Sequence, residues 1–285
     1  MSSKSDTTSS SAPNKTVLIT GCSSGIGQET AKWFNDRGWH VCATARIVDD
    51  IQQLKESGCD AYQLDVTDPD EIENVISQVL ADNGQINCLV NNAGYGQFGP
   101  VEEVPTTSLH EQFDVNVYGP HRLTRTVLPH MRERGSGTII NISSVAGRVA
   151  LPSAGTYCAS KHALETLSDA LRPEVEPYGI DVVVVEPGLV DTRFPQRITE
   201  DLDVLEQTGA YDWFYQALSK FESLDGWGKA IPPENVAQTI YQAATVDNPN
   251  PRYPVGTTAS VGILTRHVPA AIRDKIFRVL QSVLN

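Results

Sequence analysis

Short runs of apolar and mostly β-branched residues alternate along the chain with stretches whose apolar positions recur at helical spacing. Six runs predict strands, at residues 16–20, 40–45, 61–64, 86–90, 138–142 and 180–185. Helices are expected at residues 28–36, from about 69, over 106–133 and over 154–176. Asp68 is placed to cap the second of these helices, with Pro69 at its first position.

Several of the predicted strands are nearly all apolar, as expected when a parallel sheet is covered by helices on both faces. The alternation of strand and helix predicts an α/β fold, a single-domain Rossmann-like doubly wound sheet with right-handed crossovers. No repeat or linker divides the chain after its first residues, so we expect a disordered tail at 1–14 and one domain over 15–285.

Charge and cysteine usage narrow the function. A formal net charge of −13 disfavours nucleic-acid binding, which needs a basic face. The five cysteines and six histidines show no metal-ligand spacing, so we expect reduced thiols and no metal site. Residues 1–14 lack the apolar core of a secretory signal, and no apolar run reaches membrane-spanning length. These features predict a cytoplasmic protein without a transmembrane segment.

A glycine-rich turn follows the first predicted strand, with the sequence Thr20-Gly21-Cys22-Ser23-Ser24-Gly25-Ile26-Gly27. Glycines allow the backbone to approach a pyrophosphate closely, and the start of a helix presents free N–H groups and a positive dipole to it. An ordinary glycine-rich turn between strand and helix is the alternative interpretation.

Tyr157 and Lys161 are four residues apart and would share one face of a helix. A tyrosine is a poor base near neutrality because its pKa is about 10, and a neighbouring ammonium would lower that pKa. Taken alone, the pair is also common on helix surfaces. The motifs found elsewhere in the chain favour a catalytic pair over an ordinary pair on a helix surface.

The order of the motifs resembles the short-chain dehydrogenase/reductase family over about residues 15–255. The glycine turn is followed by Asn91-Asn92-Ala93-Gly94, by Asn116, by Ser144, by Tyr157-x-x-x-Lys161, and by Pro187-Gly188 with Thr192. The resemblance implies an oxidoreductase that transfers hydride between a nicotinamide and a carbonyl or alcohol.

The resemblance also implies residue roles. The catalytic residues would be Asn116, Ser144, Tyr157 and Lys161, with Ser144 and Tyr157 contacting the substrate oxygen. The cofactor would contact Gly21, Ser23, Ser24, Gly25, Ile26, Gly27, Arg46, Asp65, Val66, Asn92, Ala93, Gly94, Tyr157, Lys161, Pro187, Gly188 and Thr192. Asp65 would contact the adenine, although a turn or cap carboxylate is nearly as good an interpretation.

The end of the second predicted strand bears on the choice of nicotinamide. Ala45 stands where members of the family that use NAD have Asp, and Arg46 follows it. A guanidinium can hold a phosphate with two charge-assisted bonds, so we predict NADP(H). A surface pair of Arg46 with Asp49 or Asp50 is the alternative.

Residues 189–230 correspond to the substrate-binding region of the family, and they are rich in aromatic residues. The aromatic side chains are Tyr211, Trp213, Phe214, Tyr215, Phe221 and Trp227. They indicate a bulky apolar substrate, or equally the packing of a helix on the sheet. The residues within these motifs resemble those of the hydroxysteroid and retinol dehydrogenase branch, which implies a steroid-, retinoid- or lipid-like carbonyl substrate.

Residues 269–284 predict an amphipathic helix, with Ile272, Ile276, Val279, Leu280, Val283 and Leu284 on one face. Its basic residues allow peripheral membrane contact, while packing on the domain or on another subunit is the favoured alternative. The resemblance implies a homodimer or homotetramer. Two other functions remain open: a catalytically idle NADPH-binding regulatory protein, and a nucleotide-sugar epimerase or dehydratase, whose usual loop spacing is absent.

Overall fold

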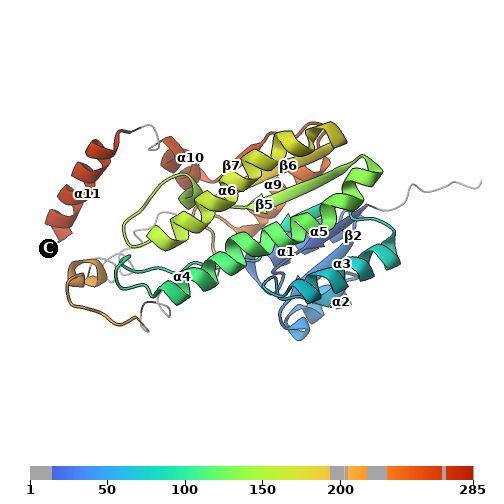
Figure 1. Ribbon diagram of the computed structural model, residues 1–285, viewed down its shortest axis with the longest axis horizontal. Helices are drawn as coiled ribbons and strands as arrows, with labels where there is room; N and C mark the ends of the chain where they lie inside the picture. Colours follow the sequence, from blue (N-terminus) through green and yellow to red (C-terminus); the bar gives the residue numbers. More distant parts are fainter. Residues whose placement is uncertain (1–14, 193–201, 203–204, 217–229, 265–267, 285) are drawn as a thin grey trace, which may run out of the picture.

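A parallel sheet of seven strands forms the centre of the protein (Figure 1). The computed structural model describes residues 15–192, 202, 205–216, 230–264 and 268–284. The strand order is β3-β2-β1-β4-β5-β6-β7. The strands are β1 (Thr16–Ile19), β2 (His40–Ala45), β3 (Asp60–Gln63), β4 (Cys88–Asn91), β5 (Gly137–Ile142), β6 (Ile180–Pro187) and β7 (Arg252–Val255).

Helices connect the strands and cover the sheet. They are α1 (Gly25–Asn35), α2 (Gln52–Glu56), α3 (Pro69–Asn83), α4 (Thr106–Phe113), α5 (Gly119–Arg134), α6 (Gly155–Val175), α9 (Pro233–Thr245), α10 (Thr257–Leu264) and α11 (Ala270–Leu284). Chain order reverses direction across the sheet between β1 and β4, and open α/β sheets bind their ligands beyond the carboxyl ends of the strands at such a point.

Two apolar cores lie on opposite faces of the sheet. On one face, Phe34 of α1 and Ile240 of α9 pack against alternate residues of the central strands, such as Ile19 and Val185. On the other face, helices α3 and α5 bury their apolar stripes, with Leu123 among the fully buried side chains. Because side chains alternate along each strand, every central strand contributes apolar residues to both cores. This explains why these strands are nearly all apolar.

The predicted fold class is confirmed. All six predicted strands are present with small shifts of their ends, and Asp68 caps α3 through Oδ1, which accepts from the backbone N–H groups of Asp70 and Glu71 at 2.9 and 3.1 Å. Helices α2, α9 and α10 and strand β7 were not predicted.

The helix predicted over residues 106–133 is interrupted. A π-helical turn at Asp114–Tyr118 separates α4 from α5, and Asn116 lies inside it. Such wide turns are rare and often occur at functional sites. The apolar pattern over 106–133 does not reveal this π-turn, because the turn spans only five residues between two α-helices.

The chain ends in α11, which lies beyond α10 at one end of the molecule (Figure 1). The helix coincides closely with the predicted 269–284. None of the helices in the described part of the chain combines the length and apolar character needed to cross a membrane. The predicted tail at 1–14 lies outside the described residues.

Candidate active site

The glycine turn is fixed by hydrogen bonds to the loop after β4. Thr20 Oγ1 accepts from the backbone N–H groups of Asn92 and Ala93, both at 3.0 Å. In return, the Asn92 amide donates to the carbonyls of Thr20 at 2.8 Å and Gly21 at 3.0 Å. The two predicted cofactor segments are therefore held together at the carboxyl edge of β1 and β4.

Close backbone approach explains two of the glycines. A Cβ on Gly27 would lie 2.3 Å from the carbonyl oxygen of Gly21, so the turn has no room for a side chain there. Gly25 has a φ of +58°, and a Cβ on it would lie 3.0 Å from Cγ2 of Thr192. Thr192, from the loop after β6, thus reaches the start of α1.

The N-terminus of α1 has the character of an anion site. Ser24 is its N-cap residue but makes no capping hydrogen bond through its side chain, and the first turn contains no acidic residue. Ser23 is exposed beside it, and Ile26 lies in the first turn. Free backbone N–H groups and two hydroxyls at a helix start fit a pyrophosphate.

Arg46 follows β2 and is exposed. Among the residues that the structure describes, no ion pair joins its guanidinium to Asp49 or Asp50, so the surface-pair alternative is not what forms. Asp65 makes a turn contact, in which its Oδ1 accepts from the backbone N–H and the hydroxyl of Thr67 at 2.9 and 2.8 Å, and its contact with the adenine stays a prediction. Val66 is buried beside these residues.

Tyr157, Ser144 and Lys161 converge where α6 begins. Tyr157 and Lys161 lie one turn apart on α6, and both are buried. The Ser144 hydroxyl hydrogen-bonds the Tyr157 phenol, and Ser144 Oγ also accepts from the backbone N–H of Ala146 at 3.1 Å. The Lys161 ammonium lies 5.9 Å from the centre of the Tyr157 ring. The predicted catalytic constellation is thus assembled in space.

Burial governs the ionisation of the pair. Burial raises the pKa of Tyr157 to about 12, although the hydrogen bond from Ser144 acts to lower this pKa. Burial also lowers the pKa of Lys161 to about 8, partly opposed by the negative charge of Glu165. The net shift of the phenol pKa is therefore upward and not the expected lowering, because desolvation of the phenolate outweighs the contacts that stabilise it. Tyr157 is therefore protonated at neutral pH.

Asn116 lies close to Lys161, across Gly94. A Cβ on Gly94 would be 3.0 Å from Asn116 Oδ1 and 3.4 Å from Lys161 Nζ. The Asn116 amide bridges the backbone of Tyr95, accepting from its N–H at 3.0 Å and donating to its carbonyl at 2.8 Å, and it also donates to Ser160 Oγ at 3.1 Å. Asn116 thus joins the loop after β4 to α6.

The Pro187-Gly188 step at the end of β6 is packed under α10. A Cβ on Gly188 would lie 2.1 Å from Thr258 Oγ1, and the same hydroxyl accepts from the backbone N–H of Leu189 at 3.2 Å. This contact fixes the direction in which the chain leaves the sheet toward Thr192. A glycine is required because α10 comes so close.

Apolar side chains cover the predicted substrate side. Phe98 stacks at a tilt on Tyr157, with ring centres 5.4 Å apart, and it also packs against the cluster of Val104, Leu202 and Leu205. Phe214 joins that cluster. Phe98 thus connects the phenol with the segment around Phe214, a role that the sequence motifs did not reveal.

Two tyrosines fix this aromatic segment. Tyr211 donates its hydroxyl to Glu102 and Tyr215 donates to Glu103, both at 2.6 Å. These contacts favour a structural role for the two tyrosines. The rings of Trp213 and Phe214 pack edge to face, with their centres 6.2 Å apart. The predicted residues Phe221 and Trp227 lie outside the described residues.

Comparison with known proteins agrees with this geometry. Residues 15–203 match the family model described as short chain dehydrogenase. The chain is 36% identical over 270 residues to the uncharacterized oxidoreductase YbbO of Escherichia coli (strain K12), covering 93% of this chain and 94% of that protein. The chain belongs to the short-chain dehydrogenase/reductase family, and it is an oxidoreductase.

Solved structures extend the comparison. A short-chain dehydrogenase from Streptomyces avermitilis superposes with a TM-score of 0.79 at 33% identity, covering 96% of this chain and 98% of that one. A serine dehydrogenase in complex with NADP+ superposes with a TM-score of 0.74 at 29% identity, covering 84% and 94%. The fold is therefore that of the family.

Proposed function

We propose that this protein reduces a carbonyl group with NADPH, through Tyr157 as proton donor, and that the reaction is reversible. The observation that carries the proposal is the convergence of the Tyr157 phenol, the Ser144 hydroxyl and the Lys161 ammonium beside the loop of Gly94. The complete set argues against a catalytically idle NADPH-binding regulator on the same fold.

Each side chain has a distinct task. The nicotinamide, when bound, supplies the hydride. Tyr157 gives its proton to the carbonyl oxygen as negative charge develops there, and Ser144 donates a second hydrogen bond to that oxygen. Lys161 stabilises the phenolate that remains and holds the ribose hydroxyls. A phenol that stays protonated at neutral pH suits the reductive direction, because the proton must be present when hydride arrives.

The choice of NADP(H) is supported by Arg46. Its guanidinium is exposed at the end of β2 and makes no ion pair with Asp49 or Asp50 in the described part of the chain, so it is free to bind the ribose phosphate. Ser23 and Ser24 add hydroxyl donors beside it. The NADP+ complex of the serine dehydrogenase supports the same choice.

For the substrate we propose a bulky apolar carbonyl or alcohol. Phe98 covers one side of Tyr157, and Ala154 and Cys158 belong to the same buried cluster. Such walls bind apolar groups by burial and leave orientation to the few polar atoms at the reacting centre. The comparisons do not single out the hydroxysteroid and retinol branch, so a steroid, a retinoid or another lipid is a prediction.

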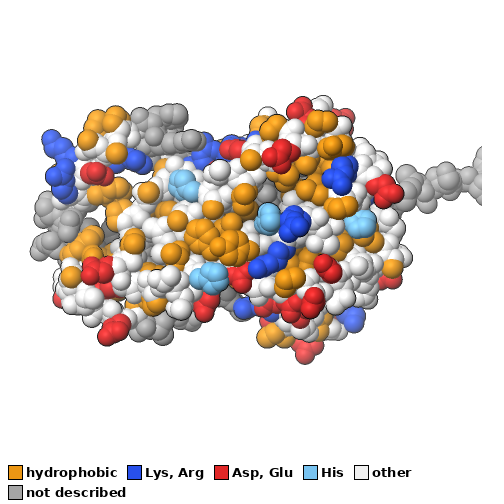
Figure 2. Space-filling model, viewed as in Figure 1, with side chains coloured by type: hydrophobic (Ala, Val, Ile, Leu, Met, Phe, Trp, Pro, Cys, Tyr) orange, Lys and Arg blue, Asp and Glu red, His pale blue; other side chains and the backbone are white. Residues whose placement is uncertain are grey.

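The remaining proposals concern location and partners. We propose a cytoplasmic homodimer or homotetramer, with α11 able to contact a membrane surface. Basic side chains gather at the end of the molecule where α11 lies (Figure 2), and Ile272 and Val279 on that helix are half exposed. A helix of this character lies at an interface rather than across it.

The test is a screen of NADPH oxidation over steroids, retinal, quinones and short ketones, with NADH as the control cofactor. Tyr157→Phe should keep its affinity for NADPH and lose at least about 100-fold in turnover, the scale of general acid catalysis. Tyr178→Phe, at an exposed position, is the matched control. NADPH binding without any turnover over the whole panel would favour the idle regulator.

A further inference from the structure

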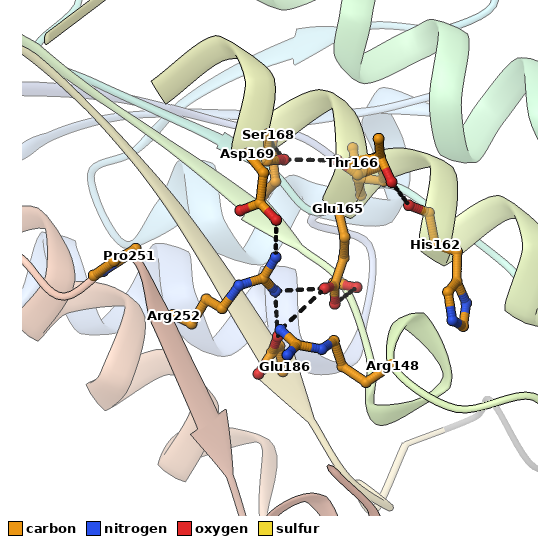
Figure 3. A network of polar contacts seen from close by, with 12 residues as sticks. Arg148, His162, Glu165, Thr166, Ser168, Asp169, Glu186, Pro251 and Arg252 are labelled. Carbon is orange, nitrogen blue, oxygen red and sulfur yellow. Dashed lines mark hydrogen bonds and ion pairs between the residues drawn. The ribbon is translucent and has the colours of Figure 1, made fainter. Parts of the chain in front are cut away.

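A cluster of ion pairs with buried carboxylates joins α6 to the strands β6 and β7 (Figure 3). Its members come from four segments: Arg148 from the turn after Ser144, Glu165 from α6, Glu186 from the end of β6, and Arg252 from the start of β7. None of these residues belongs to the motifs of the family discussed above. The first three segments carry or adjoin residues of the candidate active site, and β7 leads into α10, which packs against Gly188.

Arg252 holds the centre of the cluster. Its guanidinium donates to Glu165 and, at 2.5 Å, to both Glu186 and Asp169. Arg148 approaches from the other side, donating to Glu186 at 3.0 Å and lying 3.6 Å from Glu165. Two guanidinium groups therefore face two inner carboxylates, with Asp169 at the outer edge.

The inner carboxylates are out of contact with water. The side chains of Glu165 and Glu186 are 5% and 2% exposed, whereas Asp169 is 47% exposed. Isolated buried carboxylates are unfavourable, and removal of one partner leaves the other charge uncompensated. Such a cluster therefore has one well-defined arrangement, which makes it suitable for holding neighbouring segments in place.

Glu165 connects this cluster to the catalytic serine turn. Its Oε1 accepts a hydrogen bond of 2.7 Å from Ser143, the residue before Ser144. Gly147 makes the approach possible, since a Cβ there would lie 2.5 Å from both Glu165 Oε1 and Ser143 Oγ. The turn that carries Ser144 is thus tied to α6 by a side chain that does not touch the reacting atoms.

Glu165 also lies on the same helix face as the catalytic pair. Tyr157, Lys161 and Glu165 follow one another at four-residue intervals, so their side chains line one stripe of α6. The negative charge of Glu165 favours the ammonium form of Lys161 and opposes the effect of burial on the Lys161 pKa. Glu165 thus lies one helical turn beyond Lys161 on α6.

We propose that Glu165 is a positioning residue, which fixes the Ser143–Ser144 turn to the catalytic helix and places a carboxylate one helical turn from Lys161, with Arg252 and Arg148 holding that carboxylate in place. The consequence for turnover rests on the function proposed above. The contacts within the cluster and the charge next to Lys161 do not.

The groups around Glu165 determine when its carboxylate is ionised. In the described part of the chain these are Ser143 from the end of β5, Arg148, Glu186, Arg252, and Lys161 and Asp169 on its own helix. Burial raises the pKa of Glu165 to about 7, with the hydrogen bond from Ser143 lowering it and the charge of Glu186 raising it. Protonation of Glu165 in mild acid should therefore loosen the tie.

The test measures Lys161 directly. The rate at which acetic anhydride modifies Lys161 is followed by mass spectrometry from pH 6 to 11 in the full chain, which gives the Lys161 pKa without any turnover. Glu165→Gln removes the charge and should lower this pKa by about one unit, the smaller end of the effect of a neighbouring opposite charge. The alkaline limb of kcat/KM for NADPH oxidation should move down by the same amount.

Asp169→Asn is the matched control. It removes one negative charge from the same helix and from the same guanidinium, but at the exposed edge, so the Lys161 pKa should stay within about 0.2 units because water screens such charges. An unchanged Lys161 pKa in Glu165→Gln, with only a lower melting temperature, would show a merely structural role and overturn the proposal.

Glu165→Asp provides a second route if the glutamine variant does not fold. It keeps the charge and shortens the side chain, so the bond to Ser143 is lost while the Lys161 pKa stays close to that of the wild type. Its kcat should fall several-fold with little change in the KM for NADPH. Normal kcat in this variant would refute the tie to the serine turn. A wild-type protein that oxidises no NADPH would refute the proposed function, and acetylation would still decide the role of Glu165.

Discussion

Lys161 donates a hydrogen bond of 2.9 Å to the backbone carbonyl of Ile142, the last residue of β5. The ammonium is thereby held against the edge of the sheet, one residue before the Ser143–Ser144 turn. The bond explains how a lysine that is only 5% exposed keeps one defined position beside Tyr157. A substitution of Lys161 must therefore be judged by whether the new side chain can still bond the carbonyl of Ile142.

Replacement of Lys161 by Met should abolish nearly all turnover and weaken NADPH binding. The thioether chain fills similar space, but it can neither bond the carbonyl of Ile142 nor stabilise a phenolate. We expect a loss of at least about 100-fold in kcat. Lys161→Arg should recover little, because a planar guanidinium does not match the position of a single ammonium. Stopped-flow measurement of NADPH binding separates the two effects, and near-normal turnover in Lys161→Met would contradict the assignment.

Replacement of Gly27 by Ala should damage the glycine turn without removing any polar group. The added methyl would clash with the carbonyl of Gly21, so either the loop or α1 must shift. We expect a destabilisation of about 1–3 kcal/mol, typical of overpacking, and a clear loss of NADPH affinity. Gln28→Ala, at the next position of α1, is the control and should change neither. Urea unfolding and fluorescence titration with NADPH give the two values.

Arg46→Asp should raise the KM for NADPH by about 10- to 100-fold, the effect of charge-assisted hydrogen bonds to one phosphate. The KM for NADH should change much less, since NADH lacks that phosphate. Lys55→Asp makes the same change of charge at an exposed position of α2 and serves as the control. Equal effects of Arg46→Asp on both cofactors would remove the argument for NADP(H).

Tyr215→Phe should raise the KM for a bulky carbonyl several-fold while leaving that for NADPH unchanged. The lost hydroxyl is the one that donates to the buried Glu103, which anchors the aromatic segment beside Phe98. Tyr211→Phe removes a similar bond to the exposed Glu102 and should have a smaller effect. Steady-state kinetics with one large and one small ketone would reveal whether the segment contacts the substrate, and equal effects of the two variants would speak against it.

The stability of the protein should fall above about pH 9. Burial raises the pKa of all five cysteine thiols, to about 12 for Cys22 and Cys42 and about 11 for Cys59. A thiol of the unfolded chain loses its proton near pH 9 while the folded thiol keeps it, so the stabilisation present below pH 9 is lost as pH rises through the folded pKa. Lys161 acts in the opposite direction between pH 8 and 10.5, but one amine does not offset five thiols.

Urea unfolding at pH 8 and pH 10 would measure this slope. Each fully buried thiol contributes about 1.4 kcal/mol per pH unit within its window. Because the window of the Cys22 thiol opens at its unfolded pKa of 9.0 and the side chain is completely buried, Cys22→Ala should reduce the loss of stability between pH 8 and pH 10 by about 1.4 kcal/mol in total. A slope that does not change in this variant would show that other groups govern the alkaline transition.

Much of the fold followed from periodicity, and the reasons are physical. Strands such as β6 are buried on both faces, so their composition is unmistakable, and Asp68 with Pro69 marks the start of α3 through backbone chemistry. β7 was missed because Arg252 and Tyr253 are only half buried there, so the strand lacks an apolar run. Helix α9 follows a region without a clear pattern, and its amphipathic face was not recognised.

The candidate site, like the fold, was predicted in part. The motif residues Ser144, Tyr157 and Lys161 were predicted and lie together. The ion pair between Glu165 and Arg252 was not predicted, because the two residues are 87 positions apart in the chain and meet only in the fold. A contact across that distance leaves no local signal in one sequence. Charged residues within apolar stretches, such as Glu186 in β6, were the available clue.

Phe98 belongs to two apolar clusters at once, that of Tyr157 and that of Leu202, Leu205 and Phe214. The groups that make and break bonds are fixed to the sheet, whereas the groups on the far side of this ring come from a separate stretch of chain. Selectivity can therefore diverge while the chemistry is preserved. Libraries that randomise residues 205–216 and retain Phe98, screened over the panel of carbonyl compounds, would show whether this segment sets the choice of substrate.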